Sequence, residues 1–396
     1  MREQNTGRLT ALDVLRGVAV AGMIVVNSPG DWGHAYAPLK HADWNGWTPT
    51  DMVFPMFLFG VGLALGLSFP RALGEREARN KLWLRVGRRV IALILLGLFL
   101  NWASLLPAVL SGPTPGADAH LGLRLPGVPQ RIALCYLAAV VLVLATGRKD
   151  EQGRTALNAP ALAVAGVASL VIYWALLRFV PVPGFGPGGL DPVGSLTAYI
   201  DRAVFTPAHM WSQGWATPNG PVTYDPEGLL STLPAVFNVL AGVLAGREWR
   251  RNGEPRLLWL AGASALMFVL GLVLHPVFPI NKRLWTSSFA LLSSGFSGLT
   301  LVVVVLALRS KLAERWAEPL KALGGNAILA YAISELLGVL GGVPVKGTSP
   351  QAWGFGLVRG VIPDDNLASL TCAIGILVIV TAMIWPLHRR AIHFRL

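Results

Sequence analysis

Charged residues are scarce in this chain: Asp, Glu, Lys and Arg together make up 14% of its 396 residues, while 53% are hydrophobic. A typical soluble domain carries about 25% charged residues and builds one core of limited size. So few charges over so long a chain exclude a soluble globular protein. Apolar runs separated by shorter polar segments predict instead an all-α polytopic membrane protein.

Cysteine is equally scarce, and both copies, Cys135 and Cys372, lie within apolar runs. This excludes a disulfide framework and leaves the redox compartment open. The chain shows no metal-ligand spacing and no phosphate-cradling glycine loop, so we expect no metal. Its net charge of +12 would suit nucleic acid, but no nucleic-acid-binding module is present. We therefore expect the basic residues to face anionic membrane lipid.

The apolar runs are about as long as the ~20 residues that a helix needs to cross the hydrocarbon core. Lipid offers no hydrogen-bond partners, so each span should be a helix. The first span holds Asp13 and Arg16 and is followed by no small-residue cleavage pattern, which predicts a retained helix rather than a signal peptide. We predict about ten spans, at 9–27, 50–69, 89–108, 130–146, 159–180, 229–246, 257–275, 286–308, 322–341 and 366–387.

Lys and Arg concentrate in every second connection, which orients the spans by the positive-inside rule. The pair Lys282 and Arg283 is a local exception on the opposite side. This distribution predicts that both termini are cytoplasmic and that the loop after the first span faces a periplasm or lumen. The predicted cytoplasmic segments are the N-terminus, 71–89, 148–154, 247–256, 309–321 and 389–395.

We find no internal repeat and expect one transmembrane domain over 1–396. The longest interruption is the Gly- and Pro-rich region 181–228, on the side opposite the termini. A loop of this length is usually a binding loop, a lid or disordered. A second loop on that side, 342–365, carries Trp353, and the two loops are expected to roof a cavity above the bundle.

The densest polar segment is the loop between the first two spans, from Asn27 to Asp51. His41 in this loop can act as a general base or as an acyl-carrying nucleophile near neutral pH. Asp51 or Asp43 is near enough in sequence to orient its ring. His34 is the rival, and a merely solvated loop histidine is the alternative.

The residues beside His41 favour a sugar-binding pocket, because Trp44 and Asn45 place an aromatic ring next to an amide. Another pair of charged residues lies inside the first span. Asp13 and Arg16 share a helix face and form either a structural ion pair or a site in which Arg16 contacts an anionic ligand.

Near the outer ends of later spans, Arg131 is either a planar donor to phosphate or carboxylate or a snorkelling side chain. Asp225 and Glu227 precede the sixth span, where the helix dipole alone would favour acidic groups.

Six segments carry a family resemblance. RLTALDVLRGVAVAGMIVVN (8–27) and KHADWNGWTPTDMVFPMFLFGVG (40–62) resemble the catalytic domain of heparan-alpha-glucosaminide N-acetyltransferases and of NagX-like bacterial transmembrane acyltransferases. The matches continue in family order with GVPQRIALCYL (127–137), DPEGLLSTLPAV (225–236), NKRLWTSSFAL (281–291) and LGGNAILAY (323–331). The resemblance covers nearly the whole chain, and the first two motifs are the specific ones.

The resemblance implies a ten-helix bundle that passes an acetyl group from cytosolic acetyl-CoA to a glucosamine amine on the opposite side. The family's active-site histidine falls on His41 and its asparagine on Asn27; we assign Asp51 as the residue that orients the imidazole. Expected donors to acetyl-CoA are Arg16, Arg131 and Asn326. Expected acceptor-binding residues are Trp44, Asn45, Asp225, Glu227, Lys282 and Trp285.

The chain begins almost directly with its first span, without the large lumenal domain of the animal enzymes. This favours a bacterial inner-membrane protein that acts on a small amino sugar; a homodimer is left open. The alternatives are a transporter of N-acetylglucosamine or a related sugar, since intramembrane charges also serve transport, and a membrane scaffold without chemistry.

Overall fold

The computed structural model describes residues 2–69, 76–111, 122–149, 155–218, 220–253 and 256–394. Over these ranges the chain folds into helices, and its regular strands are a two-residue antiparallel pair, β1 (Arg148–Lys149) and β2 (Thr155–Ala156). The predicted all-α fold is confirmed. Parts of the basic segments 71–89 and 148–154 lie outside the described residues.

Eight apolar helical segments in the described ranges are long enough to cross a membrane. The molecule is therefore a multi-pass membrane protein, as predicted. The segments belong to α1 (Arg2–Asn27), α2 (Pro49–Ser68), α3 (Arg76–Ala103) with α4 (Leu106–Ser111), α5 (Val128–Thr146), α6 (Ala159–Phe179), α9 (Leu257–Leu274), α10 (Ser287–Ala307) and α15 (Asp365–Arg389).

The predicted span 229–246 corresponds to α8 (Thr232–Asn252), which is less apolar than the eight. It packs against α2, α5, α6 and α10, so protein rather than lipid surrounds it. Its backbone touches that of α2, because a Cβ on Gly62 would overlap the carbonyl oxygen of Val239 and one on Gly242 would overlap that of Phe59. This burial accommodates polar residues that lipid would not. The total of ten spans stays a prediction.

The predicted span at 322–341 is not one continuous helix. The chain forms α12 (Glu318–Gly325) and α13 (Ala327–Gly342), bent by 88° at a break on Asn326. The Asn326 side chain supports the break: its Nδ2 donates to the carbonyl of Ile392 at 3.2 Å, and its Oδ1 accepts from the amide of Phe394 at 2.7 Å. Broken backbone at membrane depth is tolerated where protein groups satisfy it in this way.

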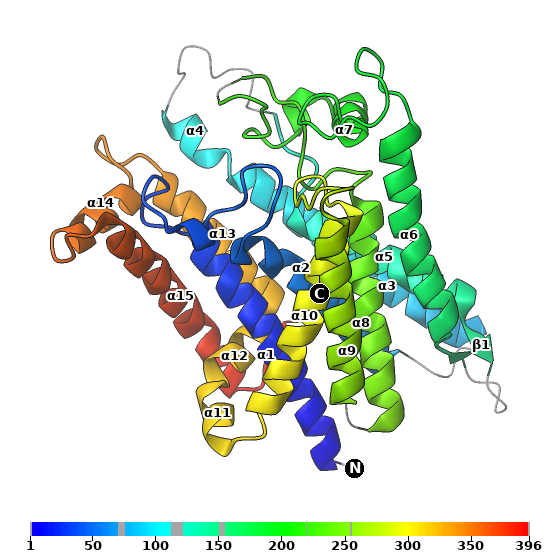
Figure 1. The fold of residues 1–396 in the computed structure, drawn as a ribbon. Coiled ribbons are helices and arrows are strands. Elements are labelled where there is room, and N and C mark those ends of the chain that lie inside the picture. Colours follow the sequence, from blue (N-terminus) through cyan, green and yellow to red (C-terminus); the bar gives the residue numbers. More distant parts are fainter. Residues whose placement is uncertain are drawn as a thin grey trace.

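α1 begins and α15 ends at the same end of the bundle, and the segment after α15 turns back into it (Figure 1). α12 packs against the first half of α1, since a Cβ on Gly324 would overlap the carbonyl of Asp13, and the C-terminal segment binds at the adjoining Asn326. The loop after α1 and the region 181–228 lie at the opposite end (Figure 1). The common side of the termini agrees with the charge distribution. Which side is cytoplasmic stays a prediction.

The two loops expected to roof the bundle contain short helices. The region 181–228 holds α7 (Leu196–Phe205) and the 3-10 turn η3 (Pro207–His209), and 342–365 holds α14 (Pro350–Arg359); α11 (Lys311–Trp316) lies at the other end (Figure 1). Arg202 on α7 donates to the carbonyls of Thr223 at 2.7 Å and Val193 at 2.8 Å, which ties the region together. The region is therefore an ordered layer rather than a structureless loop.

Candidate active site

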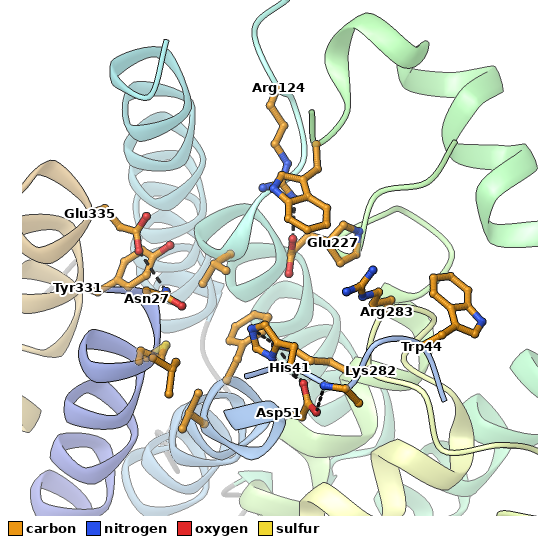
Figure 2. Close-up of a pocket in the computed structure, with 18 residues that line it drawn as sticks. Asn27, His41, Trp44, Asp51, Arg124, Glu227, Lys282, Arg283, Tyr331 and Glu335 are labelled. Carbon is orange, nitrogen blue, oxygen red and sulfur yellow. Dashed lines mark hydrogen bonds and ion pairs between the residues drawn. The ribbon is translucent and has the colours of Figure 1, made fainter. Parts of the chain in front are cut away.

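A cavity of about 240 Å³ lies beneath this layer, among α1, α2, α5, α13 and the loops that follow α1 and α9. Its lower wall is apolar, with Met23, Val26 and Phe54. The cavity also collects polar side chains from segments far apart in the sequence (Figure 2). Those that matter below are Asn27, His41, Asp51, Glu227, Lys282 and Glu335.

Asp51 is fixed before any partner reaches it, because it is the third residue of α2 and closes a capping box with Thr48. Its Oδ2 accepts from the backbone amides of Thr48 at 2.9 Å and Ala42 at 3.2 Å. Its Oδ1 is left to face His41, whose Nδ1 lies 2.7 Å away. Asp51, rather than Asp43, is therefore the carboxylate that orients the His41 ring.

This contact sets the tautomer of His41. A carboxylate only accepts hydrogen bonds, so Nδ1 carries the proton and Nε2 carries the lone pair. The side chain of His41 remains 41% accessible, whereas that of Asp51 is only 1% accessible. The arrangement is a histidine with a fixed ring whose basic nitrogen, Nε2, points away from Asp51.

Lys282 completes a triad of side chains (Figure 2). Its Nζ lies 3.0 Å from Nδ1 and 3.2 Å from Nε2 of His41, and 3.7 Å from Oδ1 of Asp51. Burial and, next, the charge of Lys282 lower the pKa of His41, although Asp51 opposes them. Burial likewise lowers the pKa of Lys282, against the pull of Asp51. His41 is thus held neutral, in the state a general base requires.

A rigid turn carries Lys282 to this place. Asn281 holds the turn through its Oδ1, which accepts from the amide of Leu284 at 2.8 Å, and Trp285 takes a φ of 53° in the left-handed region. Asn281 Nδ2 also donates to Oδ1 of Asn45 at 3.2 Å. Asn45, an expected acceptor-binding residue, therefore joins this turn to the His41 loop. Lys282 is an exception to the positive-inside rule, and its ion pair with Asp51 gives a structural reason for its position.

A second ion-pair group lies above the cavity. Arg124 donates to both oxygens of Asp225, at 2.9 and 2.7 Å, and to Glu227 at 2.5 Å. Burial alone would lower the pKa of Arg124, but the two carboxylates raise it above its ordinary value. Asp225 is fully enclosed and also accepts from the amide of Trp211 at 2.8 Å. Of the two expected acceptor-binding carboxylates, only Glu227 is among the residues that line the cavity.

Trp44 lines the cavity from the His41 loop, as expected. Its Nε1 donates to the carbonyl of Leu190 at 2.8 Å, and its ring packs edge-on against Tyr224 with centroids 5.1 Å apart. Arg283 lies over both rings, 6.0 Å from Trp44 and 5.9 Å from Tyr224. The outer wall is therefore aromatic and cationic.

Asn27 is the last residue of α1 and faces α13 across the cavity. Its Nδ2 donates to Oε1 of Glu335 at 3.4 Å, beside Tyr331 (Figure 2). Glu335, Tyr331, Arg124 and Arg283 were not among the predicted site residues. Glu335 carried a usable signal, since it is the acidic residue in the apolar run AILAYAISELLGVLGG.

The structure does not bring the expected acetyl-CoA donors to this cavity; Arg16, Arg131 and Asn326 are absent from its lining. The stem of Arg16 lies against Gly60 of α2, where a Cβ would approach its Cγ to 3.1 Å. The amide of Asn326 is occupied by the C-terminal segment. Their roles toward acetyl-CoA stay predictions.

Arg131 is buried against the expected acceptor-binding residue Trp285. Its guanidinium lies 5.0 Å from the indole centroid, and its Nη2 donates to the carbonyl of Gly228 at 2.9 Å and to Ser231. Trp285 is fully buried and donates to Oδ1 of Asn238 at 3.0 Å. Both side chains lie between helices and outside the lining of this cavity, and their roles toward a ligand stay predictions.

The rival histidine lies elsewhere. His34 Nδ1 contacts Asp31 at 2.6 Å, its Nε2 lies 3.6 Å from Asp365, and its ring stacks on Phe355. It is not among the residues that line the cavity. In the described ranges no three His, Cys, Asp or Glu side chains are grouped to hold a metal ion.

Comparison with known proteins agrees with the resemblance read from the motifs. Residues 8–110 match the family model of the catalytic region of heparan-alpha-glucosaminide N-acetyltransferase. The mouse protein of that name is 28% identical over 371 residues, covering 85% of this chain and 54% of its own length. The human protein is 27% identical over 364 residues, covering 83% and 53%. The chain spans about half the length of these curated relatives. The predicted resemblance is confirmed, and the matched region contains Asn27, His41 and Asp51.

Proposed function

We propose that this relative of the heparan-alpha-glucosaminide N-acetyltransferases is a transmembrane N-acetyltransferase. It would take the acetyl group of acetyl-CoA and transfer it to the amine of a glucosamine-type sugar at the cavity. The observation that carries the proposal is the contact of His41 with Asp51 at 2.7 Å, which leaves Nε2 of a neutral imidazole at an accessible wall. This is the arrangement needed to take a proton from an amine.

In the proposed reaction the acceptor first loses one proton from its ammonium group to solvent water, which leaves the neutral amine. The free amine attacks the thioester carbonyl, so that the C–N bond forms while the second N–H proton passes to His41 Nε2. The C–S bond then breaks, and the thiolate of CoA leaves with the electron pair. Asp51 Oδ1 stabilises the imidazolium that forms, because it already accepts the Nδ1 proton.

Asn27 supplies the group that faces the developing oxyanion. An amide carries two N–H donors, and one of them is directed to Glu335. The other is available for the thioester oxygen. A donor placed at an oxyanion in this way contributes about 10²–10³-fold to the rate.

Lys282 has to withdraw before Nε2 can accept a proton, since its Nζ lies 3.2 Å from that atom. The lysine stem is long and flexible, which allows this movement. Glu227 lines the same cavity, so the Lys282 ammonium has a carboxylate other than Asp51 to approach. In the resting state Lys282 therefore occupies Nε2 of His41, and the arriving acceptor displaces the lysine.

The donor and acceptor would arrive from opposite sides. His41 lies at the end of the bundle away from both termini, and the basic segments predict that the terminal end is cytoplasmic. Acetyl-CoA would then enter from the terminal end, past Arg16, and the bacterial inner membrane is the expected location. Acetyl-CoA and the amino sugar are the only small-molecule partners the mechanism needs.

The test uses purified protein in sealed vesicles of known orientation. Acetyl-CoA supplied on the side of the termini should acetylate glucosamine enclosed on the His41 side. Transfer only when both substrates share one compartment would overturn the transmembrane route while keeping an acetyltransferase. Uptake of unmodified N-acetylglucosamine without acetyl-CoA would instead favour the transporter alternative.

A further inference from the structure

Glu335 lies where an acidic side chain is costly. It is on the apolar helix α13, and its carboxylate faces the cavity beside Asn27 (Figure 2). An ionised group at such a depth normally has a partner of opposite charge or a wet cavity. The reaction described above uses His41, Asp51 and Asn27 but gives Glu335 no part.

The cations of the cavity wall are already engaged by other groups. Arg124 binds Asp225 and Glu227, and Lys282 lies within 3.7 Å of Asp51. Arg283 donates to the phenol of Tyr224 at 2.5 Å. Each of these positive charges has a partner within the protein.

Glu335 has none of these cations as a partner. Within the described ranges, no Lys, Arg or His nitrogen lies within 4.0 Å of its carboxylate, and its hydrogen bond is the 3.4 Å contact from Asn27. A carboxylate in a partly enclosed site pays a desolvation cost that a cation would offset. Among the described residues the carboxylate of Glu335 therefore has no cation in direct contact, and the charge of Arg124 acts on it only at longer range.

We propose that Glu335 and Asn27 form a binding subsite for the primary ammonium group of the acceptor. The inference rests on the proposed function and names how that site selects its substrate. The ammonium would donate to Glu335, whose charge it neutralises, and would lie beside the amide of Asn27. From there its protons can pass toward His41, which lines the same cavity.

This subsite selects amines against hydroxyl compounds by charge. A neutral sugar of the same shape brings no counter-ion, so its binding leaves the carboxylate of Glu335 uncompensated and also takes water from it. Charge-assisted hydrogen bonds are about twice as strong as neutral ones. Glucosamine should therefore bind more tightly than glucose even in the absence of a donor.

The experiment measures binding without acetyl-CoA, so that no reaction takes place. Glucosamine and glucose are titrated into purified wild-type protein and into Glu335→Gln, which keeps the size of the side chain and removes its charge. The wild type should prefer glucosamine by about tenfold, or ~1.4 kcal/mol. The variant should lose this preference while its affinity for glucose and for acetyl-CoA stays within about twofold.

Two controls accompany the titration. Glu314→Gln removes a charge from exposed α11 at the other end of the bundle and should keep the full preference. In the wild type, ethylammonium should compete with glucosamine and ethanol should not, which tests the subsite even if the Glu335 variant does not fold. An unchanged preference in Glu335→Gln, or no competition by ethylammonium, overturns the proposal.

The outcome is separable from that of the proposed function. Acetyl transfer by a protein whose glucosamine preference ignores Glu335 would remove the subsite and leave the enzyme. A preference that depends on Glu335 in a protein that transfers no acetyl group would keep the ammonium site and remove the acetyltransferase.

Discussion

The Nζ of Lys282 lies 3.0 Å from Nδ1 and 3.2 Å from Nε2 of His41, so a cation rests against the side chain proposed as the base. Both residues come from loops, and the 241 positions between them are bridged only by the fold. Because burial and Lys282 both lower the pKa of His41, the base stays neutral at a lower pH than a free histidine would. In the proposed mechanism this relationship sets the pH range of acetyl transfer.

Replacing Lys282 by Gln should therefore move the acidic limb of the pH–rate profile to higher pH. The neutral base is lost as pH falls through the pKa of His41, and removing the nearby cation raises that pKa toward its ordinary value. Burial, the larger cause of the lowered pKa, remains in the variant, so we expect the limb to move up without reaching the position of a free histidine. The measurement is kcat/KM for glucosamine between pH 5 and pH 8. A limb that stays in place or moves down would contradict the role given to Lys282.

Replacing His41 by Ala should abolish transfer, by about 10³-fold or more, since both proton transfer and acceptor placement depend on it. Its side chain is 41% accessible, so the truncation leaves little cavity and the unfolding temperature should change only slightly. His34→Ala is the matched control, because His34 has its own carboxylate partner but lies away from the cavity. Retained turnover in His41→Ala would remove this residue from the mechanism.

Replacing Asp51 by Asn should reduce kcat by about 10²–10⁴-fold, because an amide can hold the wrong tautomer of His41. The same change weakens the cap of α2, at a cost of roughly 1 kcal/mol. Thr48→Ala separates the two effects, since it disturbs the capping box but leaves the His41 contact. Thermal unfolding and turnover are measured for both proteins. Equal losses of activity in the two would show that only the cap matters.

Acetyl-CoA should protect the protein against heating in detergent, by about 2.7 kcal/mol at a hundredfold excess over its dissociation constant. Arg16→Ala should lose part of this protection if the guanidinium contacts the donor. Full protection in the variant would assign Arg16 to structure alone, as in the ion-pair interpretation.

Asn326→Ala offers the complementary case. The two hydrogen bonds to Ile392 and Phe394 imply a structural role, so the variant should be less stable by about 1–3 kcal/mol with an unchanged affinity for acetyl-CoA. Denaturation and acetyl-CoA titration are measured on the same preparation. A large loss of affinity without a loss of stability would restore Asn326 as a donor to acetyl-CoA.

Much of the bundle could be predicted because each apolar run had to be a helix of membrane length. The exceptions arise where protein replaces lipid. α8 carries Asn238 inside the bundle because Trp285 Nε1 bonds its oxygen, and such a partner is invisible in the sequence of either helix. The break at Asn326 depends on residues 66 and 68 positions later in the chain, which no local pattern encodes.

The site shows the same division. His41 and Asp51 could be paired from sequence because they frame one loop and its following helix. The contact between Arg131 and Trp285 could not be predicted from sequence, since an arginine and a tryptophan at helix ends suit a ligand as well as they suit each other. Glu335 was not predicted as a site residue because its segment was expected only to cross the membrane. An acidic residue inside such an apolar run nevertheless indicates a functional site.

The hydrogen bond between the Phe394 amide and Asn326 ties the C-terminal segment to the break between α12 and α13. Residues 392–394 bind the Asn326 side chain at this break, where the chain turns from one helix to the next. Removing residues 391–394 would leave the Asn326 side chain without either of these partners, and a bulky protein fused close behind Phe394 would pull against the same hydrogen bond. Fusions for purification or imaging are therefore better placed in the 181–228 layer's outer turns or joined through a long linker.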